Sequence, residues 1–570
     1  MANQRGKRWI VSEPAPDSWL AGYRGMTPIL AQVLYNRGLT TPEDAAEFLA
    51  QRDIRHNPFR LADMAKAVAR LRDAIKAGES IVVYGDFDAD GVTATALMVQ
   101  GLTALGAAHV RAYIPNRVDE GYGLNVGAID MLYDEGHRLI ITVDCGIRAL
   151  DEIAHARRRG IDVIVTDHHS LGPELPDAYA VINCKRPGYD EPMLAGVGVA
   201  FKVIDALRRA ELSNGGSERA EMFDLTQLLD LVAIGTVADL MPLNHLENRS
   251  LVRQGLDVLR SARRPGIQAL LDVSGISPES VTTSSIAFGI GPRINAAGRL
   301  SDAIDAYRLL SSSTANEAAP LADLLQRLNT ERQEKTRSAQ DLIRSEIGDS
   351  FDGSLIFAGH RDLESGIVGL VAGRMVEEYF LPAIILEFGE EESRASCRSI
   401  PEFDITAALD QCADLLVRHG GHALAAGFTV RNANIPMLRE RLSGLAHEAL
   451  HGKTVEPTLE IDAKIKVHNI TDGLVEELAQ LEPTGNGNRQ PVFAMDRAHI
   501  VDARTVGKED KHLKLRIARA GMGPLDAIGF GLGPILEDLD RFADIAFTLE
   551  FNTYRDRRSV QLRLEDVKPC

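Results

Sequence analysis

Short apolar runs alternate with longer amphipathic stretches along the first half of the chain. The runs IVVYG at 81–85, LIITV at 139–143 and DVIVT at 162–166 are rich in β-branched residues, and turn residues or helical stretches separate them. Near-continuous apolar runs of this length are typical of parallel strands buried on both faces, and helices then form the crossovers between them. The pattern therefore predicts an α/β domain built on a parallel sheet.

The second half of the chain changes its pattern twice. Residues 316–347 carry apolar residues at helical spacing beside a charged face, which predicts one long connecting helix. A second, smaller α/β segment follows at 348–450, and alternating strand-like pieces from 456–570 predict a β-barrel of the oligonucleotide-binding (OB) type. We therefore expect a parallel-sheet domain at 61–315, preceded by an N-terminal extension at 1–60.

Length and charge limit the class of protein. A chain of 570 residues is too long for a single core, because cores stop growing near ~250–300 residues. The net charge of −18 argues against broad, non-specific binding of nucleic acid, since that binding requires lysine and arginine at many phosphates. A local basic groove remains compatible with this charge. We therefore expect a multidomain protein whose contacts with any nucleic acid are confined.

The cysteines and the start of the chain bear on location. The five cysteines form no CxxC pair, so we expect reduced thiols and no zinc site. The first residues lack the apolar core of a signal peptide, and no apolar run reaches the ~20 residues that a membrane helix requires. The sequence therefore predicts a cytoplasmic protein without a membrane partner.

Three carboxylates follow the first apolar run directly. In GDFDADG, Asp86, Asp88 and Asp90 stand at alternate positions, and they repel one another unless cations lie between them. Mg²⁺ and Mn²⁺ prefer such oxygen ligands. The alternatives are a solvated acidic turn or a calcium loop, but a calcium loop of the EF-hand type requires Glu at position 97, which is Leu97 here.

Polar residues also follow the next two apolar runs. Asp144 ends one run, and Asp167, His168 and His169 end the next. Alone, each residue is explained by a helix cap or a satisfied core histidine, but successive parallel strands bring their carboxyl ends to one edge. Asp239 lies in the apolar segment GTVADLMPL, where it ligates a metal, caps a helix end or pairs with a buried arginine. Together these residues predict a two-metal phosphoesterase.

The ordered motifs resemble those of the DHH phosphoesterases, a family named for the triplet found here as Asp167-His168-His169. The resemblance extends from about residue 50 to the C-terminus through GDFDADG, TVDCG, TDHH, GTVADL, GPRINAAGR, ASCRS, GGHALAAG and LEPTGNGNRQPVF. It is strongest to the members that degrade single-stranded DNA from 5′ to 3′. It implies a DHH domain, a second DHHA1 domain that binds substrate, and the OB-like barrel.

The family resemblance also implies the roles of the site residues. Two Mn²⁺ or Mg²⁺ ions are expected, with ligands Asp88, Asp90, Asp144, His168 and Asp239. Asp86 is expected to support this cluster, Asp167 to orient His168, and His169 to donate to the scissile phosphate. Such ions activate water and stabilise the phosphoryl oxygens, so no covalent nucleophile is required. A Ser/His arrangement through Ser170 is the weaker alternative, because adjacency in sequence is not triad geometry.

Substrate selection is expected to come from residues outside the metal cluster. By resemblance, the 5′-phosphate and the backbone would be held by Arg117, Arg293, Asn295, Arg299, Ser396, Arg398 and His422. On the barrel, the residues that loosely match a single-strand groove are Lys508, Lys511, Lys514, Arg516, Tyr554, Arg555, Arg557 and Arg558. For each cation, an ordinary surface ion pair is the competing explanation.

The leading hypothesis is therefore an exonuclease that degrades single-stranded DNA in recombination and repair. A phosphatase or phosphodiesterase acting on short oligonucleotides or cyclic dinucleotides is the alternative, but the long helix and the barrel favour a polymer. A non-catalytic scaffold is disfavoured because every ligand position is filled. We expect a monomer, and the resemblance implies that it works with a single-strand-binding protein and a repair helicase.

Overall fold

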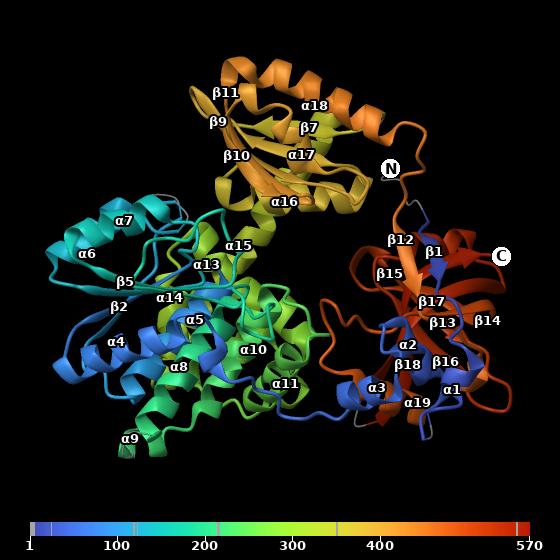
Figure 1. Ribbon diagram of the computed structural model, residues 1–570. Coiled ribbons are helices and arrows are strands. Elements are labelled where there is room, and N and C mark those ends of the chain that lie inside the picture. The colour runs from blue at the N-terminus through green and yellow to red at the C-terminus, as the bar shows by residue number, and fades with distance from the viewer. Residues whose placement is uncertain are drawn as a thin grey trace. The chain divides into compact units, whose positions relative to one another are not determined.

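The computed structural model describes residues 6–570 apart from 24, 118–119, 122, 214–216, 349–350 and 555–556. The chain forms two compact units. The DHH unit, as we call the first, comprises Arg52–Ser338 and Pro483–Asn488, and the C-terminal unit comprises Met1–Gln51, Ala339–Glu482 and Arg489–Cys570. Each unit is described by itself below (Figure 1).

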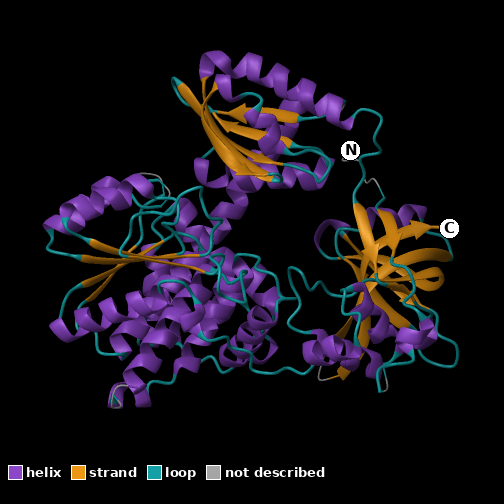
Figure 2. Ribbon diagram, viewed as in Figure 1, coloured by secondary structure: helices purple, strands orange, loops and turns teal. Residues whose placement is uncertain are grey.

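The DHH unit is built on a five-stranded, wholly parallel sheet (Figure 2). Its strands, in spatial order, are β3 (Val110–Tyr113), β2 (Ile81–Gly85), β4 (Leu139–Val143), β5 (Asp162–Asp167) and β6 (Ala180–Asn183). The first two apolar runs coincide with β2 and β4, and the third overlaps all but the last residue of β5. The prediction of a parallel α/β sheet is therefore confirmed.

Alternate residues of β2 enter different apolar clusters, which explains why its run is continuous. Ile81 and Val83 pack into one cluster, whereas Val82 and Tyr84 pack into the other. Successive side chains of a strand point to opposite faces, so a strand covered on both faces needs apolar residues at every position. The helices around this sheet are α4 (Met64–Ala77), α5 (Ala89–Ala104), α6 (Val126–Asp134), α7 (Leu150–Arg159) and α8 (Gly196–Ser213).

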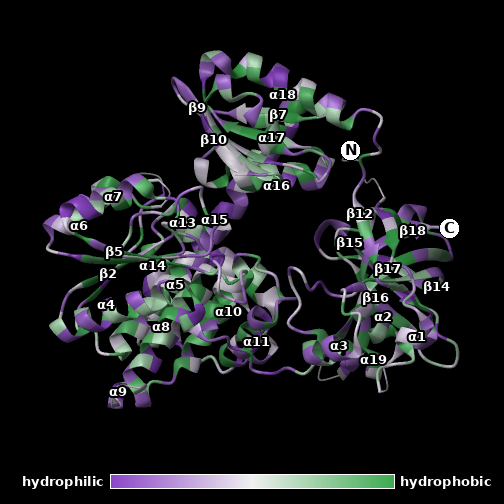
Figure 3. Cartoon of the chain, in the orientation of Figure 1, coloured by the Kyte–Doolittle hydropathy of each residue, from purple (hydrophilic) through white to green (hydrophobic). Residues whose placement is uncertain are grey.

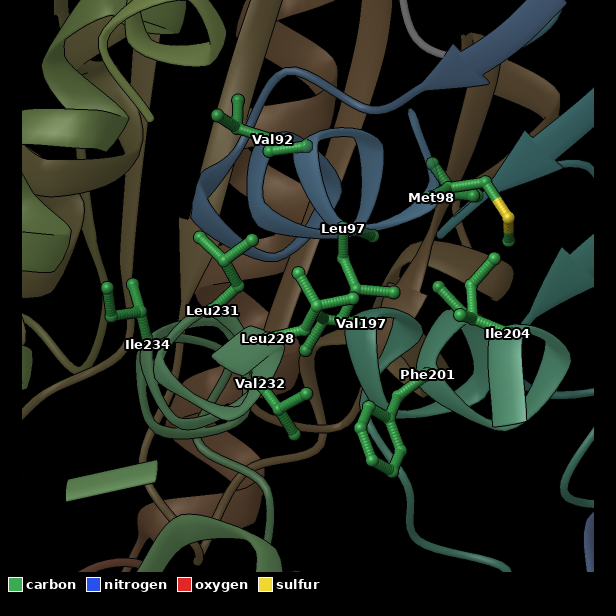
Figure 4. Close-up of a cluster of buried hydrophobic side chains, with 14 of the residues drawn as sticks. Val92, Leu97, Met98, Val197, Phe201, Ile204, Leu228, Leu231, Val232 and Ile234 are labelled. Carbon is green, nitrogen blue, oxygen red and sulfur yellow. The ribbon is translucent and has the colours of Figure 1, made fainter. Parts of the chain in front are cut away.

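A helical layer completes the DHH unit. Its elements are α10 (Leu229–Ala238), α11 (Leu246–Arg260), α12 (Pro265–Ser274), the π-helix η4 (Ser285–Ile290), α13 (Gly291–Leu300) and α14 (Ile304–Ser311). Leu97 of α5, Val197 of α8 and Val232 of α10 lie in one buried cluster (Figure 4). Helix α10 is apolar on nearly all sides (Figure 3), and every residue except Ala238 is buried.

The predicted connecting helix is α15, which runs from Ala315 to Ile347. Its first residues belong to the DHH unit and its residues from Ala339 onward to the C-terminal unit. The expected range of 316–347 therefore agrees with the observed helix to within one residue at its start. This agreement arises because a long amphipathic pattern is a strong local signal.

The C-terminal unit contains a second α/β sheet. Its strands, in spatial order, are β10 (Leu416–His422), β11 (Ala425–Arg431), β9 (Glu392–Arg398), β8 (Ala383–Glu387) and β7 (Ile356–His360). Only β7 and β8 pair in parallel, and the other pairs are antiparallel. Helices α16 (Ser365–Tyr379), α17 (Ile405–Asp410) and α18 (Ile435–Leu450) accompany it. This mixed sheet confirms the predicted second, smaller α/β domain.

The C-terminal strands close into a barrel. They are β13 (Ala463–Lys464), β14 (Phe493–Val506), β15 (His512–Ile517), β16 (Leu525–Gly529), β17 (Phe542–Tyr554) and β18 (Arg557–Pro569). The sheet closes because β14 pairs with β15 on one side and with β17 on the other. A closed sheet has no long free edge. The predicted OB-like barrel is therefore confirmed.

The N-terminal residues belong to the same unit as the barrel. Strand β1 (Arg8–Val11) pairs in parallel with β12 (Thr458–Ile461). The extension also forms the helices α1 (Asp17–Leu20), α2 (Pro28–Asn36) and α3 (Pro42–Leu49). The segment expected only as an extension thus folds against residues more than four hundred positions away. Within the described parts of the chain, no helix combines the length and apolarity required to cross a bilayer.

Candidate metal centre and substrate-binding residues

Helix N-termini hold two of the carboxylates that follow β2. Asp88 is the N-cap of α5, and its Oδ1 accepts hydrogen bonds from the amides of Asp90 (2.9 Å) and Gly91 (3.0 Å). The buried Asp90 carboxylate accepts from the amides of Gly196 (2.6 Å) and Val197 (2.9 Å) at the start of α8. Two helix ends thus orient adjacent carboxylates, as expected from the positive end of the helix dipole.

Asp144 lies at the end of β4 in an unusual backbone conformation. Its φ is +62°, in the left-handed region that residues with a Cβ seldom adopt, and its amide donates to the Thr166 carbonyl at 3.0 Å. Gly196 makes room for it, because a Cβ there would lie 2.6 Å from Asp144 Oδ1. The neighbours of Asp144 therefore accommodate its left-handed conformation, and strained residues of this kind are common at functional sites.

His168 brings the carboxylates of three elements together. Its Nε2 lies 3.1 Å from Asp144 Oδ1, 3.5 Å from Asp239 Oδ2 and 3.8 Å from Asp90 Oδ2. Among the described residues, His168 Nε2, Asp144 Oδ1 and Asp239 Oδ2 are buried and lack a hydrogen-bond partner. Buried polar atoms without partners are costly, and a cation between them would remove that cost. The donor set therefore fits a bound metal.

Among the described residues, the potential ligands fall into three groups, and within each group the ligand atoms lie within 4.8 Å of one another. The groups are Asp86-Asp88-Asp144, Asp90-His168-Asp239 and Asp144-His168-His169. The first two groups share no residue, so they can hold two ions, and Asp144 and His168 recur in the third. Carboxylates and imidazole nitrogens match divalent ions such as Mn²⁺ and Mg²⁺. Asp86, expected only as a supporting residue, lies where it can ligate directly.

The electrostatics of this cluster also favour cations. Burial, followed by the charge of a neighbouring aspartate, raises the pKa of Asp86, Asp90 and Asp144 well above the usual value. Burial and the charge of Asp88 raise the pKa of Asp239 to about 7. Burial and nearby positive charge lower the pKa of His168 to about 3, so its imidazole is neutral and able to ligate. Without cations, these carboxylates resist ionisation.

Asp167 has a different side-chain partner from the one we expected. We expected it to orient His168, but its Oδ1 lies 2.8 Å from Nδ1 of His169 and reaches His168 only through the main-chain amide. Asp167 is the last residue of β5, so its carboxylate folds back over the next two amides and meets the His169 ring. Burial lowers the pKa of His169, but this contact and the charges of Asp239 and Asp86 together outweigh it and raise the pKa to about 9.

Two of the expected substrate residues lie beside the turn after β2. The guanidinium of Arg117 lies 5.0 Å from the centre of the Phe87 ring. Burial lowers the pKa of Arg117, and the charges of Asp86 and Asp88 oppose this shift. Asn295 on α13 accepts a hydrogen bond from the Ala89 amide at 2.8 Å. Asn295 therefore supports the turn that carries the ligands, whereas Arg117 brings positive charge to it.

The other two residues of the GPRINAAGR segment also lie on α13. Arg293 donates to Gln326 Oε1 at 2.8 Å and to the Gly289 carbonyl at 2.6 Å, which links α13 to α15 and to η4. Arg299 lies in the last turn of α13. A Cβ on Gly298 would lie 2.4 Å from the Phe87 carbonyl oxygen, so the helix packs closely on the ligand-bearing turn.

Ser396, Arg398 and His422 lie in the C-terminal unit and share one face of its sheet. Ser396 and Arg398 are two residues apart on β9, and the register aligns Arg398 and His422 with Ala425 of β11 between them. A Cβ on Gly369 of α16 would lie 3.0 Å from Ser396 Oγ and 3.4 Å from an Arg398 nitrogen. These expected residues therefore form a group on the side of the sheet that α16 covers.

Most of the barrel cations have acidic partners. Lys511 pairs with Glu509 at 2.5 Å, Lys514 with Asp526 at 3.5 Å, and Arg516 with Asp526 at 3.8 Å. Arg558 pairs with Glu476 and stacks 3.5 Å from the Phe551 ring centre. Lys508 begins a short 3-10 helix. Arg555 and the side chains of Tyr554 and Arg557 lie outside the described part.

Sequence reasoning missed two contributors to the centre. One is the start of α8, where the amides of Gly196 and Val197 hold Asp90. The other is Lys185, which follows β6 and acts electrostatically on His168 and Asp239. The usable signals were the glycines of LAGVGVAF, which are typical of a helix start near an anion, and a lysine directly after a further apolar run.

Comparisons with known proteins agree with this geometry. Residues 80–236 match the DHH family, N-terminal domain, and residues 461–566 match the RecJ OB domain. The chain is 37% identical over 570 residues to the single-stranded-DNA-specific exonuclease RecJ of Bacillus subtilis, and the match covers 98% of this chain and 70% of that protein. It is 34% identical to the Escherichia coli protein of the same name, over 95% of this chain and 96% of that protein.

Solved structures are similar as well. The crystal structure of RecJ in complex with Mn²⁺ from Thermus thermophilus matches with a TM-score of 0.83 and 29% identity, over 99% of this chain and 80% of that one. The corresponding complex with Mg²⁺ matches with a TM-score of 0.78 and 28% identity, over 99% and 78%. Similar chains have therefore been solved with each of the two ions that the ligand cluster fits.

Proposed function

This chain belongs to the RecJ family of single-stranded-DNA-specific exonucleases, and we propose that it hydrolyses single-stranded DNA from the 5′ end by two-metal catalysis. The observation that carries the proposal is the convergence of buried, hydrogen-bond-deficient ligand atoms from the ends of β4 and β5 and from the turn after α10. Such a cluster suits hydrolysis without a covalent nucleophile. Recombination and repair is the corresponding cellular role.

In this proposal the metal ligands are Asp88, Asp90, Asp144, His168 and Asp239, with Asp86 as a further ligand of the first group. When bound, two Mn²⁺ or Mg²⁺ ions supply an activated water and stabilise charge on the phosphoryl oxygens. The chain itself holds the carboxylates in place through the amides at the starts of α5 and α8. It also keeps the His168 ring neutral, so that a nitrogen lone pair is available for a metal.

His169 and Arg117 are proposed to hold the scissile phosphate. The contact with Asp167 fixes the His169 ring, and the half-exposed side chain can donate to a phosphate oxygen. Arg117 brings a guanidinium to the same turn, where the carboxylates of Asp86 and Asp88 attract it. An arginine beside anionic ligands can bind phosphate when cations offset the carboxylate charge.

Substrate polarity is assigned to the C-terminal unit. Ser396, Arg398 and His422 together offer a hydroxyl, a guanidinium and an imidazole on one face of a sheet, which suits a terminal 5′-phosphate. We propose that α13 holds the backbone of the DNA strand through three of its residues, Arg293, Asn295 and Arg299. The barrel is proposed to bind single-stranded DNA further along the strand.

The proposed partners and state follow from family membership. We propose a cytoplasmic monomer that acts with a single-strand-binding protein and a repair helicase. A helicase would supply single strands, because an enzyme specific for single strands cannot start on a blunt duplex. Size-exclusion chromatography with light scattering tests the monomer, and pull-down with purified single-strand-binding protein tests the partner.

The decisive experiment compares substrates at their ends. A 5′-phosphorylated single strand, a blunt duplex, an oligoribonucleotide and a linear dinucleotide are each incubated with the purified protein and Mn²⁺, and the Asp144→Ala variant is the control. We expect stepwise loss from the 5′ end of the single strand alone, abolished by chelation and by the substitution. Exclusive cleavage of the dinucleotide would instead assign the small-substrate activity, and attack from the 3′ end would contradict the proposed polarity.

A further inference from the structure

The turn after α10 carries the ligand Asp239 and adopts a conformation that its sequence does not favour. The helix ends with hydrogen bonds from the Leu240 amide to the Val237 carbonyl (3.2 Å) and from the Met241 amide to the Thr236 carbonyl (3.0 Å). Leu240 has a φ of +55°, and the residue is 65% exposed. Helices that end in this way usually place glycine at this position, because a Cβ disfavours the left-handed conformation. The turn therefore needs support from elsewhere.

The carboxylate of Asp239 receives less main-chain support than those of Asp88 and Asp90. Asp88 and Asp90 each accept main-chain hydrogen bonds, whereas Asp239 Oδ2 has no hydrogen-bond partner among the described residues. Its direction toward His168, 3.5 Å away, depends on the backbone of its own turn. Anything that fixes this turn therefore also fixes the ligand.

The segment Pro483–Asn488 lies directly on the turn. The side-chain amide of Asn486 donates to the Leu240 carbonyl, and the Leu243 amide donates to the Asn486 carbonyl at 2.7 Å. Gly487, with a φ of +69°, allows this approach, because a Cβ there would lie 2.3 Å from Asn244 Oδ1. Asn486 thus bonds to the turn through both its side chain and its main chain.

The segment is itself held firmly. The buried Asn488 side chain donates to the Pro483 carbonyl at 2.7 Å, and the buried Arg249 of α11 donates to the same carbonyl at 3.2 Å. Thr283 Oγ1 donates to the Thr484 carbonyl at 2.6 Å. The support for Leu240 is therefore anchored on two sides. The segment belongs to the DHH unit, although the residues before and after it in the chain belong to the C-terminal unit.

We propose that Asn486 is a positioning residue for the metal ligand Asp239. By holding the carbonyl of Leu240, its amide keeps the turn in the left-handed conformation and keeps the Asp239 carboxylate directed at the metal centre. Asn486 acts through Leu240 and touches no reacting atom. The inference rests on the proposed two-ion site, but it does not depend on the DNA substrate.

Metal binding to the full chain tests this role. Residues that orient a ligand typically change metal affinity 10- to 100-fold. We expect Asn486→Ala to weaken the affinity of the metal-free protein for Mn²⁺ about tenfold, measured by isothermal titration calorimetry. The isosteric Asn486→Asp is expected to do the same, because a carboxylate cannot donate to the Leu240 carbonyl. With DNA at saturating Mn²⁺, the KM for the strand should remain unchanged.

Two further variants separate positioning from general stability. Asn434 also donates to a leucine carbonyl, that of Leu415 in the C-terminal unit, so Asn434→Ala removes a matched bond far along the chain. It should leave Mn²⁺ affinity unchanged. Adding Leu240→Gly to Asn486→Ala should restore most of the affinity, because glycine adopts the left-handed turn without support.

The outcomes are distinct. Unchanged Mn²⁺ affinity in Asn486→Ala, an equal loss in Asn434→Ala, or no recovery in the Leu240→Gly double variant would each overturn the positioning role. If the parent protein binds Mn²⁺ but does not degrade DNA, the proposed function fails while this test still stands. If the parent protein binds no Mn²⁺, the metal site itself is refuted and the inference falls with it.

Discussion

Nε2 of His168 lies 3.1 Å from Oδ1 of Asp144, and neither atom has a hydrogen-bond partner among the described residues. The contact joins the ends of two neighbouring strands, β4 and β5, at a point where burial disfavours charge. A neutral imidazole and a carboxylate that lie this close together are suited to a common cation. The contact makes Asp144 the first residue to test.

Neutralising Asp144 should abolish hydrolysis while stabilising the metal-free protein. Asp144→Asn removes a carboxylate that belongs to two of the three ligand groups, so we expect nuclease activity to fall at least about 1,000-fold. In EDTA the melting temperature should rise, because the substitution removes a carboxyl group whose charged form is disfavoured by burial and by the neighbouring aspartates. Calorimetry with EDTA and with Mn²⁺ measures the stability effect, and digestion of a labelled strand measures the activity. A lower melting temperature in EDTA would show that Asp144 is mainly structural.

The metal-free protein should lose stability as the pH rises toward 7. The pKa of Asp239 is raised to about 7, so the folded state binds this proton more tightly than the unfolded state does. A raised pKa contributes stability that is present below the ordinary carboxyl pKa and is lost as the pH rises through the folded value. We expect the melting temperature in EDTA to fall between about pH 4 and pH 7, less steeply in Asp239→Asn. Equal slopes in the two proteins would contradict this assignment.

Asp167 should affect catalysis through His169 and not through metal affinity. Its carboxylate contacts the His169 ring at 2.8 Å. We expect Asp167→Asn to lower kcat about 10- to 100-fold while Mn²⁺ affinity stays within about twofold of the parent value. His169→Gln should lower kcat similarly, and the double variant should be no worse than either single one. A large loss of Mn²⁺ affinity in Asp167→Asn would instead place Asp167 with the metal ligands.

Arg398 should distinguish strands by their 5′ ends. If its guanidinium holds the terminal phosphate, Arg398→Ala should raise the KM for a 5′-phosphorylated strand about tenfold and leave that for a 5′-hydroxyl strand unchanged. Arg374→Ala is the matched control, because this exposed arginine of α16 pairs only with Glu377 in the described contacts. Equal changes of KM on the two substrates would show that Arg398 has a structural role and does not bind the 5′-phosphate.

Helix packing near the centre supplies a stability test. A Cβ on Gly101 of α5 would lie 2.7 Å from three side-chain carbons of Ile204 on α8. We expect Gly101→Ala to destabilise the protein by about 1–3 kcal/mol in urea unfolding. Gly373→Ala is the matched control, since nothing lies within 4 Å of its added Cβ, and it should be neutral or stabilise by up to about 1 kcal/mol. Similar effects of the two substitutions would contradict the close α5–α8 contact.

The convergence of the acidic and histidine residues was largely predictable because it follows local rules. Asp86, Asp88 and Asp90 come directly after β2, Asp144 follows β4, and Asp167 ends β5. Parallel strands bring their carboxyl ends to one edge, so the order of apolar runs alone predicts that these residues converge. Asp239 comes from a helix end, and its inclusion rested on the cost of a charge in an apolar segment and on family resemblance.

The pairing of individual side chains was not predictable in the same way. Asp167 and His168 are adjacent in sequence, yet the carboxylate meets the ring of His169 because β5 ends there and the chain turns. Sequence spacing could not show that the start of α8 supports Asp90. It also could not show that the segment Pro483–Asn488 supports Leu240. The spacing of residues predicts which face of a helix or strand a side chain occupies. It does not predict which amide group from a distant part of the chain forms a hydrogen bond with it.

By itself, the amino-acid sequence determined the strands, the long helix, the barrel and the chemistry of the ligands, because hydrophobic periodicity and residue type are local properties. Only the tertiary structure decided that β1 pairs with β12, that Asp144 and His168 share one position, and that Asn486 supports the turn after Asp239. These contacts join residues far apart in the chain. Their geometry depends on the packing of whole elements, which no short stretch of sequence encodes.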